Sequence, residues 1–294
     1  MTSLPLRACA LALASTFAVA AQAADATLSK IQSTGQLTIG YRSDEAPISY
    51  ADASGKPTGY AVEMCQQLAA RIQSHLKLPA LQLNYQPVTL AERFDRIADG
   101  KVQIECAATT NTKDRRERAG FGLTYYYAST RMLVRSNETR ELPSQMNGAR
   151  VAVLAGGTGQ QMSQKFPGAT VLTVGSTEEG AKAVAQGRAD TFLGDDIALI
   201  LQAKSLQGAV KVVGPRMSVE PLAPLVAKNA PDFQALVTQT MKDMYRDGTA
   251  RQIYRKWFEQ PLPAYDYALD LPPDRLLSDT FRRPDGFVTD WTVL

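Results

Sequence analysis

The stretch Val102-Gln103-Ile104-Glu105-Cys106-Ala107-Ala108-Thr109-Thr110-Asn111-Thr112-Lys113-Asp114-Arg115-Arg116 decides our prediction of the fold. Its first five residues have the apolar, partly β-branched content of a buried strand. Small and hydroxyl residues follow, and an Asn/Thr pair with Asp114 three residues after Asn111 is typical of the capped start of a helix. The stretch therefore predicts that a strand end, several hydroxyl groups and a helix start meet at one place.

Upstream of this stretch, strand-like and helix-like segments alternate. Residues 36–40 and 81–85 alternate like strands, and residues 62–72 repeat apolar side chains at helical spacing. A capping box at residues 89–92 opens a further helix, which Gly100 ends. Such β-α-β alternation predicts a mainly parallel sheet with helices on its faces.

The same pattern recurs downstream. Residues 176–179 repeat the capping box, and Gly187 falls at the offset of Gly100. The strand-like residues 191–193 then fall where residues 104–106 fell. Capping boxes and terminal glycines are common, so chance similarity is the alternative explanation. We interpret the repeat as two lobes of similar α/β construction.

Two segments suit connections between these lobes. Residues 131–134 form an apolar run fit for a connecting strand, and residues 221–227 can return the chain. We therefore expect residues 132–225 in the second lobe, and residues 24–131 with 226–294 in the first.

The C-terminal part divides into two regions. Residues 232–257 carry apolar side chains at helical spacing, which predicts a helix. After Pro261 the tail is rich in Pro, Asp and Arg and shows little periodicity. We expect this tail to wrap a surface or to fray.

The N-terminus has the features of a secretory signal peptide. Arg7 precedes an apolar run over residues 8–21, and Ala21-Gln22-Ala23 is a cleavage pattern. A membrane anchor is the alternative, but the run is shorter than the ~20 residues that a span needs. We therefore expect residues 1–23 to be a signal peptide, and the mature protein to be exported.

Charge and cysteine content narrow the protein class. The 32 basic and 29 acidic residues nearly balance, so nucleic acid is not an expected partner. The mature chain keeps two cysteines, Cys65 and Cys106. In an oxidising compartment an even pair favours a disulfide, but two small buried hydrophobes give the same pattern, and both explanations stay open.

Catalytic and metal-binding motifs are scarce. The one histidine, His75, lies in a polar sequence, and no Gly-x-Ser-x-Gly nucleophile elbow occurs. One histidine and two separated cysteines offer no zinc spacing, and the aspartates form no calcium loop. The glycine turn at residues 156–159 exposes N–H groups but lacks the Lys-Ser/Thr of a P-loop. We therefore expect no catalytic residue, metal or cofactor.

Cationic and hydroxyl side chains instead gather at predicted strand ends, together with one carboxylate: Arg42, Arg93, Thr110 and Arg115 in the first lobe, Thr158 and Asp195 in the second. Arginine binds carboxylates, and a carboxylate suits an ammonium group. A solvated helix face or a simple helix cap is the alternative for each residue. Because open α/β sheets bind ligands at strand ends, we predict a site for a zwitterion.

These motifs resemble a known family, the periplasmic solute-binding proteins (family 3) of polar amino-acid ABC transporters, most closely the glutamate/aspartate-binding branch. The matching motifs run through almost the whole mature chain: Gly40-Tyr41-Arg42 with Pro47-Ile48-Ser49-Tyr50, Gly59-Tyr60, residues 105–111 with Arg115, Gly194-Asp195-Asp196, and Lys256-Trp257-Phe258. The resemblance implies a type II periplasmic-binding-protein fold, with two α/β lobes of mainly parallel sheets joined by two hinge strands. It also implies a monomer that serves an ABC permease in the inner membrane.

The resemblance further implies roles for individual residues. Arg115 would bind the α-carboxylate of an amino acid with help from Thr110, and Asp195 would receive the α-amino group. Arg42 and Arg93 would hold an acidic side chain. Five positions depart from the glutamate/aspartate branch, where three hydroxyl residues, a threonine and a histidine are typical: Leu90, Ala108, Leu154, Gly157 and Thr177.

We count Ala108, Thr158 and Thr177 among the expected ligand-binding positions. Lost partners would weaken dicarboxylate binding by about 1–3 kcal/mol for each buried group left unpaired, unless the ligand differs to match.

We therefore expect a non-catalytic binding protein that encloses a polar L-amino acid, glutamate or aspartate favoured, by hinge closure. Two alternatives stay open. An enzyme of the cyclohexadienyl dehydratase type would need a general acid or base, for which Glu105 and Asp195 are the candidates. A ligand-sensing module would signal to a membrane protein without transport.

Overall fold

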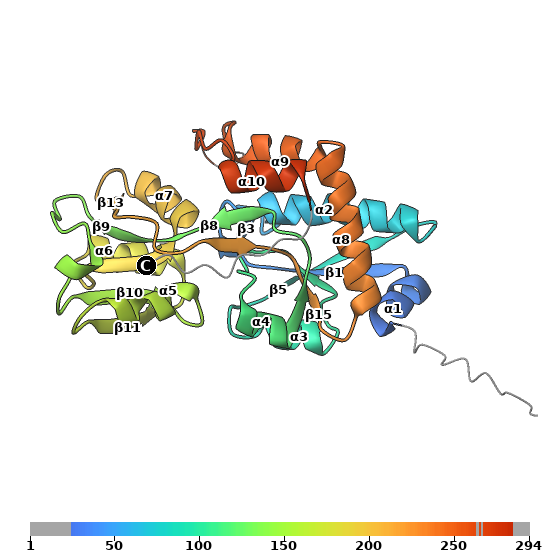
Figure 1. Cartoon of the computed structure of the whole chain (residues 1–294), viewed down its shortest axis with the longest axis horizontal. Helices are drawn as coiled ribbons and strands as arrows, with labels where there is room; N and C mark the ends of the chain where they lie inside the picture. Colours follow the sequence, from blue (N-terminus) through green and yellow to red (C-terminus); the bar gives the residue numbers. More distant parts are fainter. Residues whose placement is uncertain (1–24, 263–264, 266, 285–294) are drawn as a thin grey trace, which may run out of the picture.

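The computed structural model describes residues 25–262, 265 and 267–284 of the 294-residue chain. The predicted signal peptide, residues 1–23, lies outside the described residues. Figure 1 shows two α/β lobes side by side, joined by extended segments, as the repeated sequence pattern predicted. Within the described ranges, no helix is long and apolar enough to span a bilayer.

The first lobe contains a five-stranded sheet in the order β5 (Gln82–Pro87), β1 (Gln36–Tyr41), β6 (Ile104–Glu105), β15 (Leu225–Ala227) and β7 (Ala119–Phe121). Strand β1 is parallel to β5 and β6, whereas β15 is antiparallel to β6 and β7. The helices of this lobe are α1 (Ala26–Thr34), α2 (Tyr60–His75), α3 (Arg93–Ala98), α4 (Lys113–Arg118), α8 (Pro231–Arg246), α9 (Thr249–Phe258) and α10 (Arg275–Arg282). In Figure 1, α2, α9 and α10 lie on one side of the sheet, and α3 and α4 on the other.

The second lobe contains another five-stranded sheet, in the order β11 (Thr170–Val174), β10 (Arg150–Leu154), β12 (Thr191–Asp195), β9 (Thr130–Arg135) and β13 (Val210–Val213). Strands β10, β11 and β12 are parallel, and β9 is antiparallel to both of its neighbours. The helices are α5 (Thr158–Met162), α6 (Thr177–Ala185) and α7 (Asp196–Ser205), with two 3₁₀ turns, η1 (Pro143–Gln145) and η2 (Ser163–Lys165). Successive residues of β10 enter different cores: Val151 and Val153 pack on one face, Ala152 on the other.

Two short sheets complete the structure. Strands β8 (Tyr126–Ala128) and β14 (Glu220–Leu222) pair antiparallel between the lobes (Figure 1). Strands β2 (Asp44–Glu45), β3 (Ser49–Ala51) and β4 (Pro57–Thr58) form a small antiparallel sheet. The lobe boundaries that we expected near residues 131 and 226 stay a prediction.

The repeated helix signals have repeated structures. Gly100 after α3 and Gly187 after α6 both have left-handed backbones, with φ of 68° and 72°. The Ser176 hydroxyl accepts from the Glu179 N–H at 3.1 Å and caps α6. The Thr89 hydroxyl accepts from the Glu92 N–H at 3.3 Å, but residues 90–92 form a turn and the regular helix begins only at Arg93.

The C-terminal part refines two predictions. The segment 232–257 is helical as predicted, but in two helices, because Gly248, with φ of 84°, separates α8 from α9. The tail, which was expected to wrap a surface or to fray, contains the helix α10. Asp274 caps α10 by accepting from the Leu277 N–H at 2.8 Å, and Phe281 packs edge-on against the ring of Tyr245. The buried residues of α10, Leu277 and Phe281, are four residues apart, a helical spacing that sequence reasoning missed.

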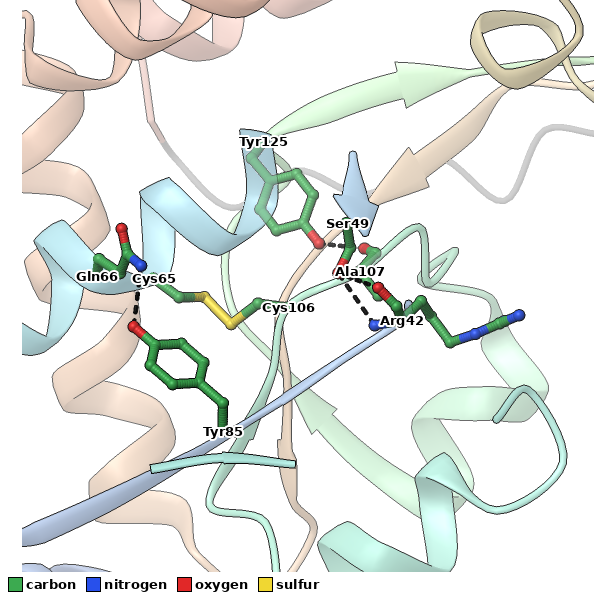
Figure 2. The surroundings of a disulfide bond; sticks show 8 residues. All are labelled: Arg42, Ser49, Cys65, Gln66, Tyr85, Cys106, Ala107 and Tyr125. Carbon is green, nitrogen blue, oxygen red and sulfur yellow. Dashed lines mark hydrogen bonds between the residues drawn. A yellow bond between two sulfur atoms is a disulfide. The ribbon is translucent and has the colours of Figure 1, made fainter. Parts of the chain in front are cut away.

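Cys65 and Cys106 form a disulfide, which decides between the two explanations left open by the sequence (Figure 2). The bridge ties α2 to Cys106, the residue after β6, within the stretch 102–116 from which the fold was predicted. Nearby, the Tyr125 hydroxyl donates to the Ala107 carbonyl, and the Gln66 amide donates to the Tyr85 hydroxyl at 2.9 Å. These contacts fix the chain directly before Ala108.

Replacing both cysteines, in the variant Cys65→Ala/Cys106→Ala, should lower the free energy of unfolding by about 4 kcal/mol. The bridge closes a loop with a sequence separation of 41, and the chain-entropy model assigns this loss to the freed unfolded chain. Urea unfolding of the oxidised wild type, the reduced wild type and the variant measures it. Equal midpoints for the oxidised wild type and the variant would contradict the expectation.

Candidate ligand-binding site

A cavity lies where the carboxyl ends of β6 and β12 face one another from the two lobes. Seven of the eight predicted ligand-binding residues line it: Arg93, Ala108, Thr110, Arg115, Thr158, Thr177 and Asp195. The lining also includes Leu90, Leu154 and Gly157, three of the positions that depart from the glutamate/aspartate branch. Strand ends therefore meet at the cavity as the α/β pattern predicted.

Arg115 projects from the short helix α4. Thr112, rather than Asn111, caps this helix by accepting from the Arg115 N–H at 3.3 Å. The guanidinium donates from Nη1 to the Thr110 carbonyl at 3.0 Å, and from Nη2 to the Gly156 carbonyl of the other lobe at 3.3 Å. Burial lowers the pKa of Arg115, while Glu220 and Asp195 oppose that shift. In the described part of the chain, no carboxylate forms an ion pair with Arg115.

Arg93 is the second cation at the cavity, and it is 2% exposed. Its Nε and Nη1 atoms are buried and have no hydrogen-bond partner in the part of the chain that the structure describes. Burial lowers the pKa of Arg93 to about 10, and the charge of Arg115 acts in the same direction. No ion pair compensates this guanidinium within residues 25–262, 265 and 267–284. An unpaired buried cation is costly, so the site is suited to an anion from outside.

Asp195 supplies the opposite charge. It stands at the end of β12 directly before α7, but its side chain makes no capping hydrogen bond. Asp195 thus occupies the N-cap position of α7 without a side-chain capping hydrogen bond among the described residues. Burial raises the pKa of Asp195 well above its ordinary value, and the charges of Glu220 and Glu45 raise it further. A donor from a ligand would stabilise its ionised form.

Asp196, the next residue, has a different environment. Its carboxylate accepts from the Ser129 N–H at 3.2 Å and pairs with Arg216 at 3.0 Å. Asp196 is thus occupied within the protein, and only the first member of the Asp-Asp pair lines the cavity.

Thr110 links the cavity to the strands between the lobes. Its hydroxyl donates to Glu220 Oε2 at 2.9 Å, while Thr130 donates to Glu220 Oε1 at 2.6 Å. With its proton committed to Glu220, the Thr110 hydroxyl is free only to accept. It therefore suits an ammonium better than the carboxylate that the resemblance implied. Sequence reasoning missed Glu220, which is 110 residues away.

Arg42 does not line the cavity, unlike the other predicted residues. The side chain is buried, and its guanidinium pairs with Glu45 at 2.7 Å and with Asp44 at 2.8 Å. The prediction that Arg42 contacts an acidic ligand therefore finds no support in this geometry, since its charge is already compensated. Glu45, which sequence reasoning missed, lines the cavity instead. Its spacing of three from Arg42 was the available signal.

Glu105, a candidate acid or base of the enzyme alternative, is fully buried and does not line the cavity. Its Oε1 accepts from the Thr109 hydroxyl at 2.9 Å, and its Oε2 has no hydrogen-bond partner. Burial raises the pKa of Glu105 to about 7, opposed by the charge of Arg93. Its position does not favour proton transfer with a molecule in the cavity.

The cavity therefore combines two cations, one carboxylate without a donor, and apolar groups such as Ile48, Leu90 and Ile197. This combination can hold a molecule with a carboxylate and an ammonium group at fixed positions. Among the described residues, no group of three or more His, Cys, Asp or Glu is arranged to hold a metal ion.

Comparison with known proteins gives the class. The sequence profile of the bacterial extracellular solute-binding proteins, family 3, matches residues 37–260, so the chain belongs to this family. The L-glutamate/L-aspartate-binding protein of Pseudomonas aeruginosa is 30% identical over 267 residues, 88% of each chain. The glutamate/aspartate import solute-binding protein of Salmonella typhimurium is 27% identical over 274 residues, 90% of each chain.

Solved structures agree with the fold. The ancestral amino acid-binding protein AncCDT-1, a precursor of cyclohexadienyl dehydratase, aligns with a TM-score of 0.70 and 28% identity, over 79% of this chain and 98% of its own. An ancestral arginine-binding protein bound to glutamine has a TM-score of 0.70 and 24% identity, over 77% and 99%. These likenesses confirm the predicted type II periplasmic-binding-protein fold.

Glu105 makes stability depend on pH. Its pKa is raised from 4.5 to about 7, so the folded chain keeps a proton that the unfolded chain releases between these pH values. The free energy of unfolding therefore falls as pH rises through this window, by about 3 kcal/mol from this group. Glu105→Gln should raise the melting temperature at pH 8 and have little effect near pH 4.5.

Thermal unfolding at both pH values tests this. The control is Glu117→Gln, which changes an exposed glutamate on α4. A gain for Glu105→Gln that is the same at both pH values would rule out titration of Glu105 as its cause.

Proposed function

We propose that the protein captures an L-amino acid between its two lobes and delivers it to the permease of an ABC importer. One observation carries this proposal: Arg93 and Arg115 lack carboxylate partners among the described residues and share a cavity with Asp195, which lacks a donor. A zwitterion would compensate all three at once. Transfer of unpaired charge out of water costs several kcal/mol, so each group gains from such a ligand.

Glutamate and aspartate are the first ligands to test. Arg115 suits the α-carboxylate and Asp195 the α-amino group, which leaves the unpartnered Nε and Nη1 of Arg93 for a second carboxylate. The relatives from Pseudomonas and Salmonella named above carry glutamate and aspartate in their names. Leu90 and Leu154 make the lining more apolar than a dicarboxylate requires.

The remaining parts of the proposal concern the location of the protein, its oligomeric state, its lobe boundaries and whether it is an enzyme. We place the mature protein in the periplasm as a monomer, with residues 1–23 as its signal peptide, residues 24–131 and 226–294 in one lobe, and residues 132–225 in the other. We also propose that it is not an enzyme, which the position of Glu105 outside the cavity lining supports.

Calorimetry with the purified mature protein and a panel of the L-amino acids tests the function. Binding of at least one amino acid at micromolar concentration is expected, and binding of none would reject the proposal. Turnover of prephenate or arogenate would favour the dehydratase alternative instead, since AncCDT-1 is described as a precursor of such an enzyme.

Arg115→Ala should weaken amino-acid binding about 100-fold or more. Hydrogen bonds to a charged group contribute about 1.5–3 kcal/mol each, and the variant loses the fork that would hold the carboxylate. Arg118→Ala is the matched control, because it removes an exposed arginine from the same helix. Calorimetric titration with the best ligand measures both, and equal affinities would show that Arg115 does not bind the carboxylate.

Asp195→Asn should weaken the binding of glutamate about tenfold. It should leave the affinity for glutarate, which lacks the amino group, unchanged. The lost charge matters only where an ammonium is present, so the wild type should prefer glutamate to glutarate and the variant should not. Competition titrations of both ligands give the ratio. An equal loss for the two ligands would mean that Asp195 acts on the site as a whole rather than on the ammonium.

A further inference from the structure

Glu45 brings an extra carboxylate into the cavity. It lies at the end of β2, it is 8% exposed, and it lines the cavity together with Ala108 and Arg93. Its Oε1 accepts from Arg42 Nη1 at 2.7 Å, and its Oε2 accepts from the Ala108 N–H at 3.0 Å. A guanidinium and a backbone N–H thus form an anion position whose occupant is a side chain of the protein itself.

Further contacts hold both sides of this position. The Arg42 Nη2 donates to Asp44 at 2.8 Å. The backbone of Arg42 is also fixed, because its N–H donates to the Ser49 hydroxyl at 3.0 Å and this hydroxyl donates back to its carbonyl at 3.2 Å (Figure 2). Ala108 comes directly after Cys106, which forms the disulfide, and Ala107, whose carbonyl accepts from the Tyr125 hydroxyl. The position is therefore preorganised, and its occupant rather than its shape decides what it binds.

The charge of Glu45 also reaches the ligand-binding groups. Asp195 lines the same cavity, and the charge of Glu45 adds to the effect of burial in raising the pKa of Asp195. A second carboxylate on a ligand would still have Arg93 as a partner, but it would meet the charge of Glu45 and would find the Arg42 guanidinium and the Ala108 N–H occupied. A ligand amide would not be repelled, because each oxygen of Glu45 keeps a lone pair that can accept from the amide N–H group.

We infer that Glu45 is a specificity-determining residue. Its carboxylate takes the anion position formed by Arg42 and the Ala108 N–H, and so disfavours acidic ligand side chains relative to the corresponding amides. This inference rests on the proposed amino-acid-binding function. It explains what Arg42 does in this chain: it holds a carboxylate, but an internal one.

Two variants test the inference. Glu45→Gln removes the charge with little change of shape, and Glu45→Ala frees both donors. Each should lower the dissociation constant for glutamate relative to that for glutamine by about tenfold or more, the size expected when about 1.4 kcal/mol of repulsion or competition is removed. Asp44→Asn is the matched control, because Asp44 also pairs with Arg42 but does not line the cavity. We expect it to change the ratio less than twofold.

Calorimetry of the wild type and the three variants with glutamate, glutamine, aspartate and asparagine gives the ratios, and thermal unfolding checks that each variant is folded. Acquired glutamate or aspartate binding in either Glu45 variant supports the inference, even if the wild type prefers another amino acid. Unchanged ratios in both folded variants, or an equal change in Asp44→Asn, overturn it while the proposed function stands. No amino-acid binding by the wild type or any variant overturns both.

Discussion

The arrangement of this protein depends on how it compensates charge at the junction of its lobes. Arg42, Arg93 and Arg115 all stand near the ends of first-lobe strands, yet only Arg42 has carboxylate partners among the described residues. Arg93 and Arg115 keep their charges available, and burial strengthens every interaction that they make. The two lobes bring Arg93 and Arg115 to the same cavity as Asp195 and Glu45, and the proposed zwitterion rests on this arrangement.

Much of the fold follows from local sequence. The strands around residues 36–41 and 102–106, and the paired helix ends at Gly100 and Gly187, carry their own signals of periodicity, capping and left-handed glycine. The break at Gly248 lay inside an apolar period that runs on through it. Helix α10 depends on packing against Tyr245 and Tyr254, which local sequence does not report.

The site also has features that the sequence predicts and features that it does not. Residue types at strand ends identified five of the lining residues, because a parallel sheet brings those ends together, and the resemblance added Ala108 and Thr177. The hydrogen-bond partners of these residues were not predictable, because they come from distant positions in the sequence. Glu45 is 63 residues from Ala108, and Glu220 is 110 residues from Thr110. The resemblance implied that Arg42 holds an acidic side chain of the ligand, but Arg42 lies outside the cavity lining and pairs with Asp44 and Glu45, which the resemblance does not report.

The two hydrogen bonds of Arg115 differ in what they require. The bond to the Thr110 carbonyl lies within the first lobe, whereas the bond to the Gly156 carbonyl crosses to the second. Separation of the lobes breaks only the crossing bond, so one edge of the guanidinium is already oriented before any closure. On the proposed function, a ligand carboxylate would therefore meet an oriented Arg115 on the first lobe before the second lobe brings Asp195 to the ligand.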